Sequence, residues 1–402
     1  MRSCINSRAS YLARTCPPWE LKKHAEEFDA LIDASLAASL GLDNLSPAAS
    51  IIRGLPCGLQ VPRLASISPA AWVSSFTTAL DFGSRTNRAH WEWTSSGCPA
   101  SISSLSSHLS VIHSLIPAFA FGESQVTLER QKALTELSVE VDTAKVESLL
   151  AASPASLCWF RAQKTNKAHW SSWSLWRSSC GRLTHLSPAE FITAVKLRLC
   201  LNISADISPN HPCVCSLAPN RRDVFADSPV DSLHCLSCDR MGGHISIRHN
   251  RLRDLIAAFV RQYSPSSSAE REAVIKLGHE QHKSDIKITF ESGPSFFLDV
   301  TVFNPACVSL LKYSPSELMT KKVAEKRDQY KHVGILSSSP YFVPVVFDAT
   351  GNLCHEAISF FKTHFPSQLF RLLGSLNVCL ASGNSDIVHR YLSDRPPALG
   401  RQ

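Results

Sequence analysis

The sequence lacks several features that would assign it to a broad class of protein. No apolar run approaches the roughly 20 residues that a membrane-spanning helix needs, and the first residues lack the apolar core of a signal peptide. No aromatic-x-Asp-Asp motif is present, which excludes a polymerase centre of that type. The Gly-x4-Gly-Lys-Ser/Thr loop is also absent, so no nucleotide cofactor is implied.

The composition is that of a folded protein with a modest positive charge. Of the 402 residues, 44% are hydrophobic, which argues against disorder along the whole chain. The formal net charge of +7 permits binding to nucleic acid, and basic residues are dense between 240 and 287. The 14 cysteines follow no disulfide framework, which favours a reducing compartment with free or metal-bound thiols.

The spacing of cysteine and histidine predicts a zinc site in the middle of the chain. Cys213 and Cys215 form one pair, and His234 and Cys238 form a second pair after an irregular loop. Two ligand pairs of this kind supply two edges of the tetrahedron that structural zinc requires. Cys235 is an alternative ligand, and ordinary burial of the cysteines is the competing interpretation.

Two aspartates on neighbouring predicted strands indicate a site for a divalent cation. Asp285 begins the alternating segment 285–290, and Asp299 lies in a second β-rich run at 296–303. A hairpin would bring the two carboxylates together near one end of a sheet. Hard oxygen ligands suit Mg²⁺ or Mn²⁺. Glu280 is a further candidate ligand, and the alternative interpretation is two solvated surface carboxylates.

The order of these motifs resembles the C-terminal region of non-LTR retrotransposon proteins, where a zinc knuckle precedes a restriction-like endonuclease of the PD-(D/E)xK type. Cys213, Cys215, His234 and Cys238 match the zinc knuckle. The segment 55–71 resembles a segment that follows the polymerase core in that family. Three further matches are Arg248-His249-Asn250, then Lys283-Ser284-Asp285 with Asp299, and then Asn304-Pro305 after that strand. Residues 324–330 resemble the helix that follows the active site in that family.

Three positions depart from the family pattern. Ser284 replaces the usual Pro, Ser216 replaces a common Gly, and Thr301 stands where the catalytic Lys is usual. The cationic role would then fall to Lys326 on the next helix. Lys322 lies one turn earlier on the same face, and a solvated helix surface is the alternative interpretation for both.

The resemblance implies roles for individual residues. The implied catalytic residues are Asp285, Asp299, Lys326, Lys283 and Tyr330, with Mg²⁺ or Mn²⁺ on the two aspartates and the carbonyl of Val300. The implied DNA-binding residues are Arg248, His249, Asn250, Arg251 and Arg253, because the basic start of a helix suits phosphate contact. DNA is the expected partner and the RNA of a retroelement a further candidate, with no membrane. A nuclear location follows from the substrate, and a cytoplasmic one is the alternative.

The expected fold class is a multidomain α+β protein. An all-α thumb- or linker-like region is expected at 1–200, the zinc knuckle at 201–240, an α/β endonuclease core with a mixed central sheet at 241–380, and a flexible tail at 381–402. Helices are predicted at 20–40, after Ser46, and at 126–137, 142–152, 187–200, 249–262, 316–332 and 353–373. Strands are predicted at 285–290, 296–303 and 341–348. Pro344 indicates that the last is an edge strand or contains a bulge.

A short peptide occurs twice. Thr-Asn-Arg-Ala-His-Trp at 86–91 recurs with one substitution at 165–170. Interleaved basic and aromatic residues suit stacking on single-stranded nucleic acid, but two similarly packed helix starts, or chance, are the preferred interpretation.

Two hypotheses of different classes follow. In the first, the protein is a metal-dependent DNA endonuclease. In the second, it is a zinc-dependent nucleic-acid-binding remnant whose nuclease core folds but no longer cuts. The presence of Asp285 and Asp299 favours the first, and Thr301 with the missing polymerase favours the second.

Overall fold

The structure is a computed structural model that describes residues 11–72, 74–75, 131–165, 186–203, 233–277, 280–291, 293–330 and 341–393. The chain divides into two compact units, Met1–Leu149 and Leu150–Gln402. Among the described residues no helix is long and apolar enough to cross a lipid bilayer.

Helices dominate the described part of the chain, which also holds one four-stranded sheet. The α-helices are α2 (Pro18–Ser39), α3 (Pro47–Ile52), α6 (Gln131–Leu150), α7 (Pro154–Thr165), α8 (Pro188–Arg198), α10 (Gly242–Tyr263), α11 (Pro315–Gln329), α12 (His355–His364) and α13 (Leu369–Ser393). The strands are β1 (Ser268–Leu277), β2 (Glu280–Thr289), β3 (Ser295–Phe303) and β4 (Phe342–Asp348). Short 3-10 helices are η4 (His234–Ser237), η5 (Asp239–Met241), η6 (Val308–Leu310) and η8 (Pro366–Gln368).

In the first unit a buried ion pair joins α2 to the chain that follows α3. Arg53 is fully buried, and its guanidinium lies 3.1 Å from the carboxylate of Asp29. That carboxylate also accepts the backbone N–H groups of Leu64 and Ala65, at 2.9 and 3.0 Å. These bonds satisfy the buried carboxylate, and they fix the segment after α3 against α2.

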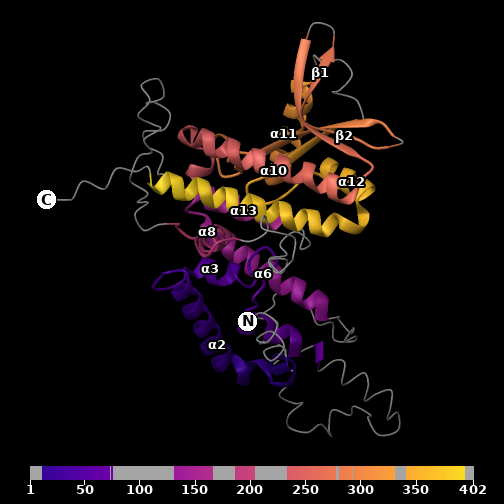
Figure 1. The fold of residues 1–402 in the computed structure, drawn as a ribbon. Helices are drawn as coiled ribbons and strands as arrows, with labels where there is room; N and C mark the ends of the chain where they lie inside the picture. Colours follow the sequence, from indigo (N-terminus) through magenta and orange to yellow (C-terminus); the bar gives the residue numbers. More distant parts are fainter. Residues whose placement is uncertain are drawn as a thin grey trace, which may run out of the picture. The chain divides into compact units, whose positions relative to one another are not determined.

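The second unit is built on a mixed sheet with the strand order β1-β2-β3-β4 (Figure 1). The pairs β1–β2 and β2–β3 are antiparallel, and β3–β4 is parallel. The chain is therefore α+β with a mixed sheet, as predicted. β2 pairs with β1 along its whole length but with β3 only as far as Ile286 opposite Leu298. Beyond that point the β1–β2 hairpin stands away from the other strands (Figure 1).

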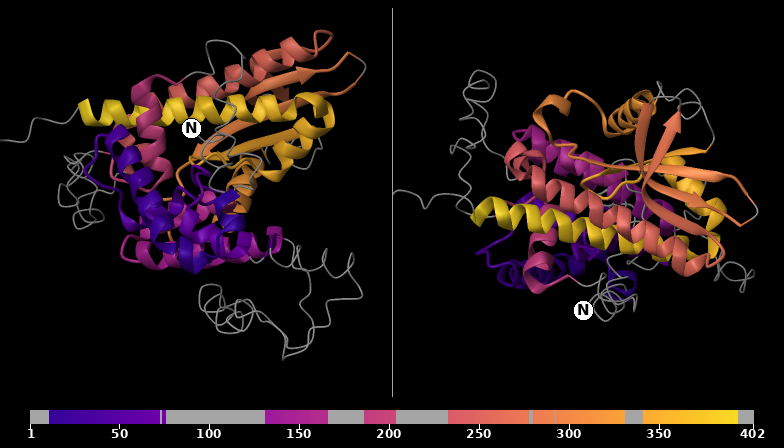
Figure 2. Two further views of the ribbon diagram at one scale, coloured as in Figure 1. Left: turned by 90° about the horizontal axis from the view of Figure 1, so that it is seen from below. Right: turned by 45° about the horizontal axis from the view of Figure 1, so that its top comes forward.

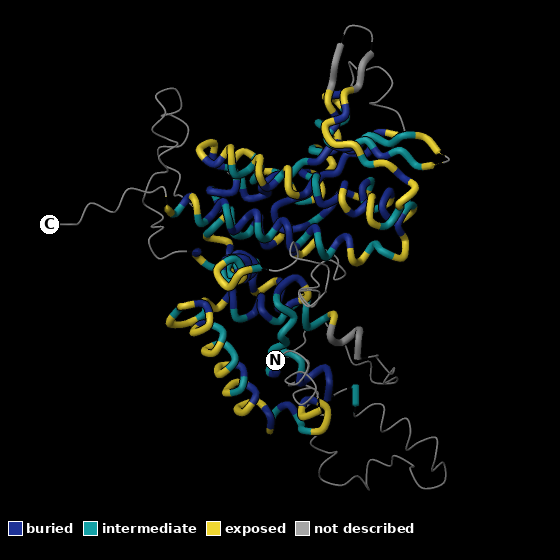
Figure 3. The backbone as a smooth tube through the Cα atoms, in the orientation of Figure 1, coloured by how far each residue is buried: buried dark blue, intermediate teal, exposed yellow. Residues whose placement is uncertain are grey.

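Apolar side chains from the sheet and its helices form one core in the second unit. On α10 the buried residues Leu252, Ile256 and Val260 recur every four positions, so they share one face of the helix. Ile286 and Ile288 of β2 are fully buried in the same cluster. β4 is buried along its whole length, as a strand covered on both faces would be. α10 lies beside α13 (Figure 2), and Figure 3 shows the buried residues gathered between the helices and the sheet.

Two predicted helical regions differ from the observed ones. α6 is one helix where two were predicted, because no Gly or Pro interrupts it. The predicted helix 353–373 is two helices, α12 and α13, since Pro366 cannot continue the first. α13 then runs to Ser393. The prediction of a flexible tail at 381–402 is therefore wrong for residues 381–393. Ile387 and Tyr391 near its end are buried and hold it in place.

Other differences concern elements that the sequence did not predict. β1 was missed because its Glu-Arg-Glu-rich sequence favours a helix, and pairing with β2 overrides that preference. α7 was also missed. α7 and α8 belong to the second compact unit, which begins at Leu150. β4 pairs only with β3 within the described sheet, so the edge position predicted from Pro344 is confirmed for that part of the chain.

Candidate active site

The two predicted metal-binding aspartates lie together where β2 and β3 separate. Asp285 and Asp299 occupy the positions next to the last pair of the register, Ile286 opposite Leu298. The backbone N–H of Val300 donates to Asp285 Oδ2 at 2.7 Å, in place of a bond between the strands. Because the strands separate here, the carboxylate of Asp285 on β2 can bind the backbone of β3, the strand that carries Asp299.

His249, which lies on α10, contacts both β2 and β3 at this site. Its Nε2 lies 3.1 Å from Asp285 Oδ2 and 2.9 Å from the carbonyl oxygen of Val300. Both neighbours are acceptors, so Nε2 carries the hydrogen and donates. Nδ1 lies 3.3 Å from the side-chain oxygen of Asn250. The sequence placed His249 among DNA contacts, whereas in the structure it contacts the carboxylate of Asp285.

Lys326, which lies on α11, forms an ion pair with Asp299. Its Nζ lies 2.8 Å from Asp299 Oδ2, and both side chains are largely buried. The sequence had suggested this lysine in place of Thr301. Lys322, one turn earlier, forms its ion pair with Glu325 at 2.6 Å and is not brought to the aspartates.

The two carboxylates have opposite electrostatic environments. Burial raises the pKa of Asp299 to about 6, although the charge of Lys326 acts to lower it. Burial would also raise the pKa of Asp285, but the hydrogen bonds from His249 and Val300 lower it below its ordinary value. The hydrogen bond to Asp285 in turn raises the pKa of His249. Asp285 is thus the carboxylate that ionises first, as expected for two close carboxyl groups.

The hydroxyl of Tyr330 is hydrogen-bonded and lies close to the carboxylate of Asp299. The residue follows α11 directly, and its ring packs on Phe342 with 4.5 Å between centroids. Its hydroxyl donates to the backbone carbonyl of Lys283 at 3.1 Å, and burial raises the pKa of the phenol. The contact to Lys283 is thus through its backbone, while its side chain is exposed.

The residues present suit a cation such as Mg²⁺, which needs few protein ligands, better than a metal ion that is enclosed by protein ligands alone. In the described part of the chain no three His, Cys, Asp or Glu side chains are arranged to hold a metal ion. Mg²⁺ commonly takes only one or two carboxylates and completes its shell with water and substrate phosphate. Asp285, Asp299 and the carbonyl of Val300 would provide such a partial shell, and Lys326 would offset part of the negative charge of the two carboxylates.

The predicted zinc site lies only partly within the described residues. Cys213 and Cys215 fall outside them. His234 begins η4, and Cys238 follows it and is buried, as is Cys235. Asn304, at the end of β3, donates to the carbonyl of Leu233 at 2.9 Å. The second half of the predicted knuckle is therefore fixed to the strand that carries Asp299, and zinc itself stays a prediction.

Some of the predicted DNA-binding residues are exposed to solvent, and others are buried. α10 begins at Gly242, so the expectation that Arg248 starts a helix is wrong, and the argument from a helix N-terminus does not apply. Arg248 is 1% exposed and donates to Asn384 of α13 at 2.7 Å, and burial lowers its pKa to about 10. Such a buried guanidinium cannot contact a phosphate. Asn250 and Arg251 are exposed.

Arg253 is also held within the fold. It is buried, and it donates to Asp254 at 3.0 Å and to Glu272 of β1 at 2.7 Å. Glu272 has a φ of 52°, which non-glycine residues seldom adopt, and it lies where the β1–β2 register skips the partner of Asp285. Arg253 therefore anchors a kink in β1 beside the site.

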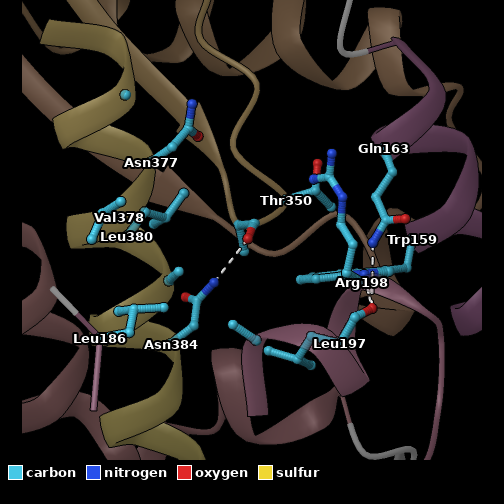
Figure 4. Close-up of a pocket in the computed structure, with 14 residues that line it drawn as sticks. Trp159, Gln163, Leu186, Leu197, Arg198, Thr350, Asn377, Val378, Leu380 and Asn384 are labelled. Atoms are coloured by element: carbon cyan, nitrogen blue, oxygen red, sulfur yellow. Dashed lines mark hydrogen bonds between the residues drawn. The ribbon is translucent and has the colours of Figure 1, made fainter. Parts of the chain in front are cut away.

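A separate small cavity lies between α7, α8 and α13 and does not include the carboxylates (Figure 4). Its volume is about 70 Å³, and its walls include Trp159, Arg198 and Asn384. Asn384 donates to the carbonyl of Ala349 at 2.8 Å, and Trp159 donates to that of Leu197 at 3.0 Å. None of the residues that line it is acidic, so it does not offer a carboxylate site for a cation.

The position of His249 could have been found from the spacing of α10. It lies three residues before Leu252 and seven before Ile256, which places it on the apolar face that meets the sheet. Arg248 is four residues before Leu252, on the side that faces α13. What the sequence did not reveal is where the helix begins.

Comparison with known proteins assigns no family. The sequence matches no protein-family model, and no curated protein is significantly similar to it.

Proposed function

We propose that the second unit is a metal-dependent DNA endonuclease of retrotransposon origin, which nicks a target strand and has no polymerase activity. The observation that carries the proposal is the meeting of Asp285 and Asp299 from adjacent strands, with Lys326 Nζ 2.8 Å from Asp299. Two carboxylates and a lysine are the groups that a PD-(D/E)xK nuclease uses, and here the lysine comes from α11.

Each group of the chain has a distinct task in this proposal. Asp285, Asp299 and the carbonyl of Val300 would hold Mg²⁺ or Mn²⁺, which when bound stabilises charge on phosphoryl oxygens and lowers the pKa of water. Lys326 presents a cation beside that position and stabilises negative charge that develops on the phosphate. Tyr330 orients β2 through its hydrogen bond to the carbonyl of Lys283, two residues before Asp285.

Further parts of the proposal concern partners and location. A structural zinc would be bound by Cys213, Cys215, His234 and Cys238. DNA would be gripped by exposed residues such as Asn250 and Arg251, and the RNA of a retroelement is a second candidate partner. A nuclear location follows from a DNA substrate.

A catalytically inactive nucleic-acid-binding remnant is the second candidate. Thr301 in the usual lysine position favours it, and so does the contact of His249 with a carboxylate that the cation would need. Both candidates predict binding to DNA, and only the first predicts cleavage.

Two lysines of α11 provide a matched test. Lys326→Ala should lower the nicking rate about 10²- to 10³-fold, the usual cost of removing one group that stabilises developing charge. Lys322→Ala removes an equal charge from the same helix, but one that is paired with Glu325, and should leave the rate nearly unchanged. DNA affinity, measured by fluorescence anisotropy, should be similar in both. Equal loss of nicking in the two variants would contradict the assigned role of Lys326.

A further inference from the structure

The Nε2–H of His249 lies between two oxygens of the proposed cation site. Nε2 lies 3.1 Å from Asp285 Oδ2 and 2.9 Å from the carbonyl oxygen of Val300. A nitrogen that carries a hydrogen cannot ligate a metal ion at the same time. In this arrangement the imidazole is therefore a hydrogen-bond donor to two prospective ligands and not a ligand itself.

The donors around Asp285 leave little room for a cation on its Oδ2. That oxygen accepts from the backbone N–H of Val300 at 2.7 Å and from His249. A carboxylate oxygen has two lone-pair directions, so these two donors fill it. The N–H of Val300 is fixed in β3, whereas the imidazole of His249 is on a side chain that can rotate away. Of the two donors, His249 is the one that can leave.

We infer that His249 is a positioning residue that competes with the cation, holding Asp285 Oδ2 and the carbonyl of Val300 in place until metal binding displaces its N–H. The inference rests on the proposed function, since it concerns the same cation site. It assigns to His249 a role other than the DNA contact that the sequence suggested, and it predicts an effect opposite to that of losing a ligand.

The surroundings of the imidazole support this role. His249 is on the face of α10 that meets the sheet, and its other ring nitrogen lies 3.3 Å from the side-chain oxygen of the exposed Asn250. The side chain of His249 is 28% exposed, so part of the ring already faces solvent.

The test is the affinity for Mn²⁺ at pH 8, measured by electron paramagnetic resonance without DNA. His249→Ala should bind Mn²⁺ at least about tenfold more tightly than the wild type, the factor expected when a competing hydrogen bond to a charged group is lost. His249→Gln keeps an N–H donor and should stay near the wild-type value. His244→Ala, on the same helix, is the matched control for loss of an imidazole and should have no effect.

Asp299→Ala separates the two possible failures. If it abolishes Mn²⁺ binding and His249→Ala leaves the affinity unchanged or weaker, competition by His249 is refuted while the cation site stands. If wild type, Asp299→Ala and His249→Ala all show the same absence of binding, the proposed cation site fails as well. Because His249→Ala could disturb folding, a second measurement uses the wild type labelled with ¹⁵N-histidine. Saturating Mg²⁺ should shift the Nε2 signal of His249, and an unchanged signal would refute displacement.

Discussion

Asp299→Asn should make the protein more stable when no metal is bound, because the ionised carboxylate is unfavourable in the fold. Asp299 is 6% exposed, and its pKa in the folded chain is about 6 against an ordinary value of 3.8. Each pH unit of that difference corresponds to about 1.4 kcal/mol. Above pH 6 the ionised group therefore lowers the free energy of unfolding by about 3 kcal/mol, a sum that already includes the attraction of Lys326.

The pH dependence has a definite sign. Well below pH 3.8 the carboxyl is protonated in both folded and unfolded chains, so the substitution should have little effect. Between pH 4 and pH 6 the unfolded chain ionises first, and the stability contributed by this group falls as the pH rises. The advantage of Asp299→Asn should grow across that window and then stay constant. We expect a gain of about 1–3 kcal/mol at pH 8, since an amide only approximates a protonated carboxyl.

The assay is urea unfolding in EDTA at pH 4, 6 and 8, with Asp285→Asn as the control. The pKa of Asp285 is lowered, so its ionised form is stabilised by the fold and its neutral replacement should be destabilising at pH 8. That loss should shrink as the pH falls through the pKa of Asp285. Two neighbouring carboxylates should thus respond with opposite signs. A less stable Asp299→Asn at pH 8, or a more stable Asp285→Asn, would refute the electrostatic account of the site.

Other predictions concern the frame that holds the site. Gly383→Ala should lower the free energy of unfolding by about 1–3 kcal/mol, because a Cβ there would lie 2.6 Å from Cγ of the buried Arg248. Gly243→Ala, where a Cβ meets nothing within 4 Å, should be neutral or stabilising by up to about 1 kcal/mol in the same unfolding assay. Ser187→Ala should cost about 1 kcal/mol by removing the capping box with Glu190, and Ser187→Asp should restore most of it. Equal stabilities of the two glycine variants, or a Ser187→Ala protein as stable as the wild type, would contradict these assignments.

Local signals in the sequence were enough to predict the helices that begin with a cap. Ser46 accepts the N–H of Ala49 at 3.2 Å and is followed by Pro47, the arrangement that was read from the residue types alone. The alternation at 285–290 likewise predicted a strand, and β2 contains it, although pairing with β1 extends β2 further back to Glu280. Where a helix passed through polar residues, as α6 does, periodicity was too weak to show that it continues.

The sequence predicted the strands of the candidate site and its lysine, but not the contact that α10 makes with it. Asp285 and Asp299 could be paired because a short turn joins their strands, which makes the contact local. Lys326 was the suggested cation because it lies on the next helix. The spacing of α10 places His249 on its apolar face, but the contact of His249 with Asp285 depends on how that helix packs across the sheet, which is a tertiary property. The burial of Arg248 depends in the same way on α13, more than one hundred residues away in the sequence.

The most direct test of the proposed function is nicking of supercoiled plasmid by the purified protein with Mg²⁺, with Mn²⁺ and with EDTA. The account predicts relaxed circles only when a divalent cation is present, and it predicts that Asp299→Ala abolishes nicking while DNA affinity is kept. Zinc-loaded, folded wild-type protein that binds the plasmid but leaves it intact in both metals would contradict the endonuclease and leave the binding remnant in its place.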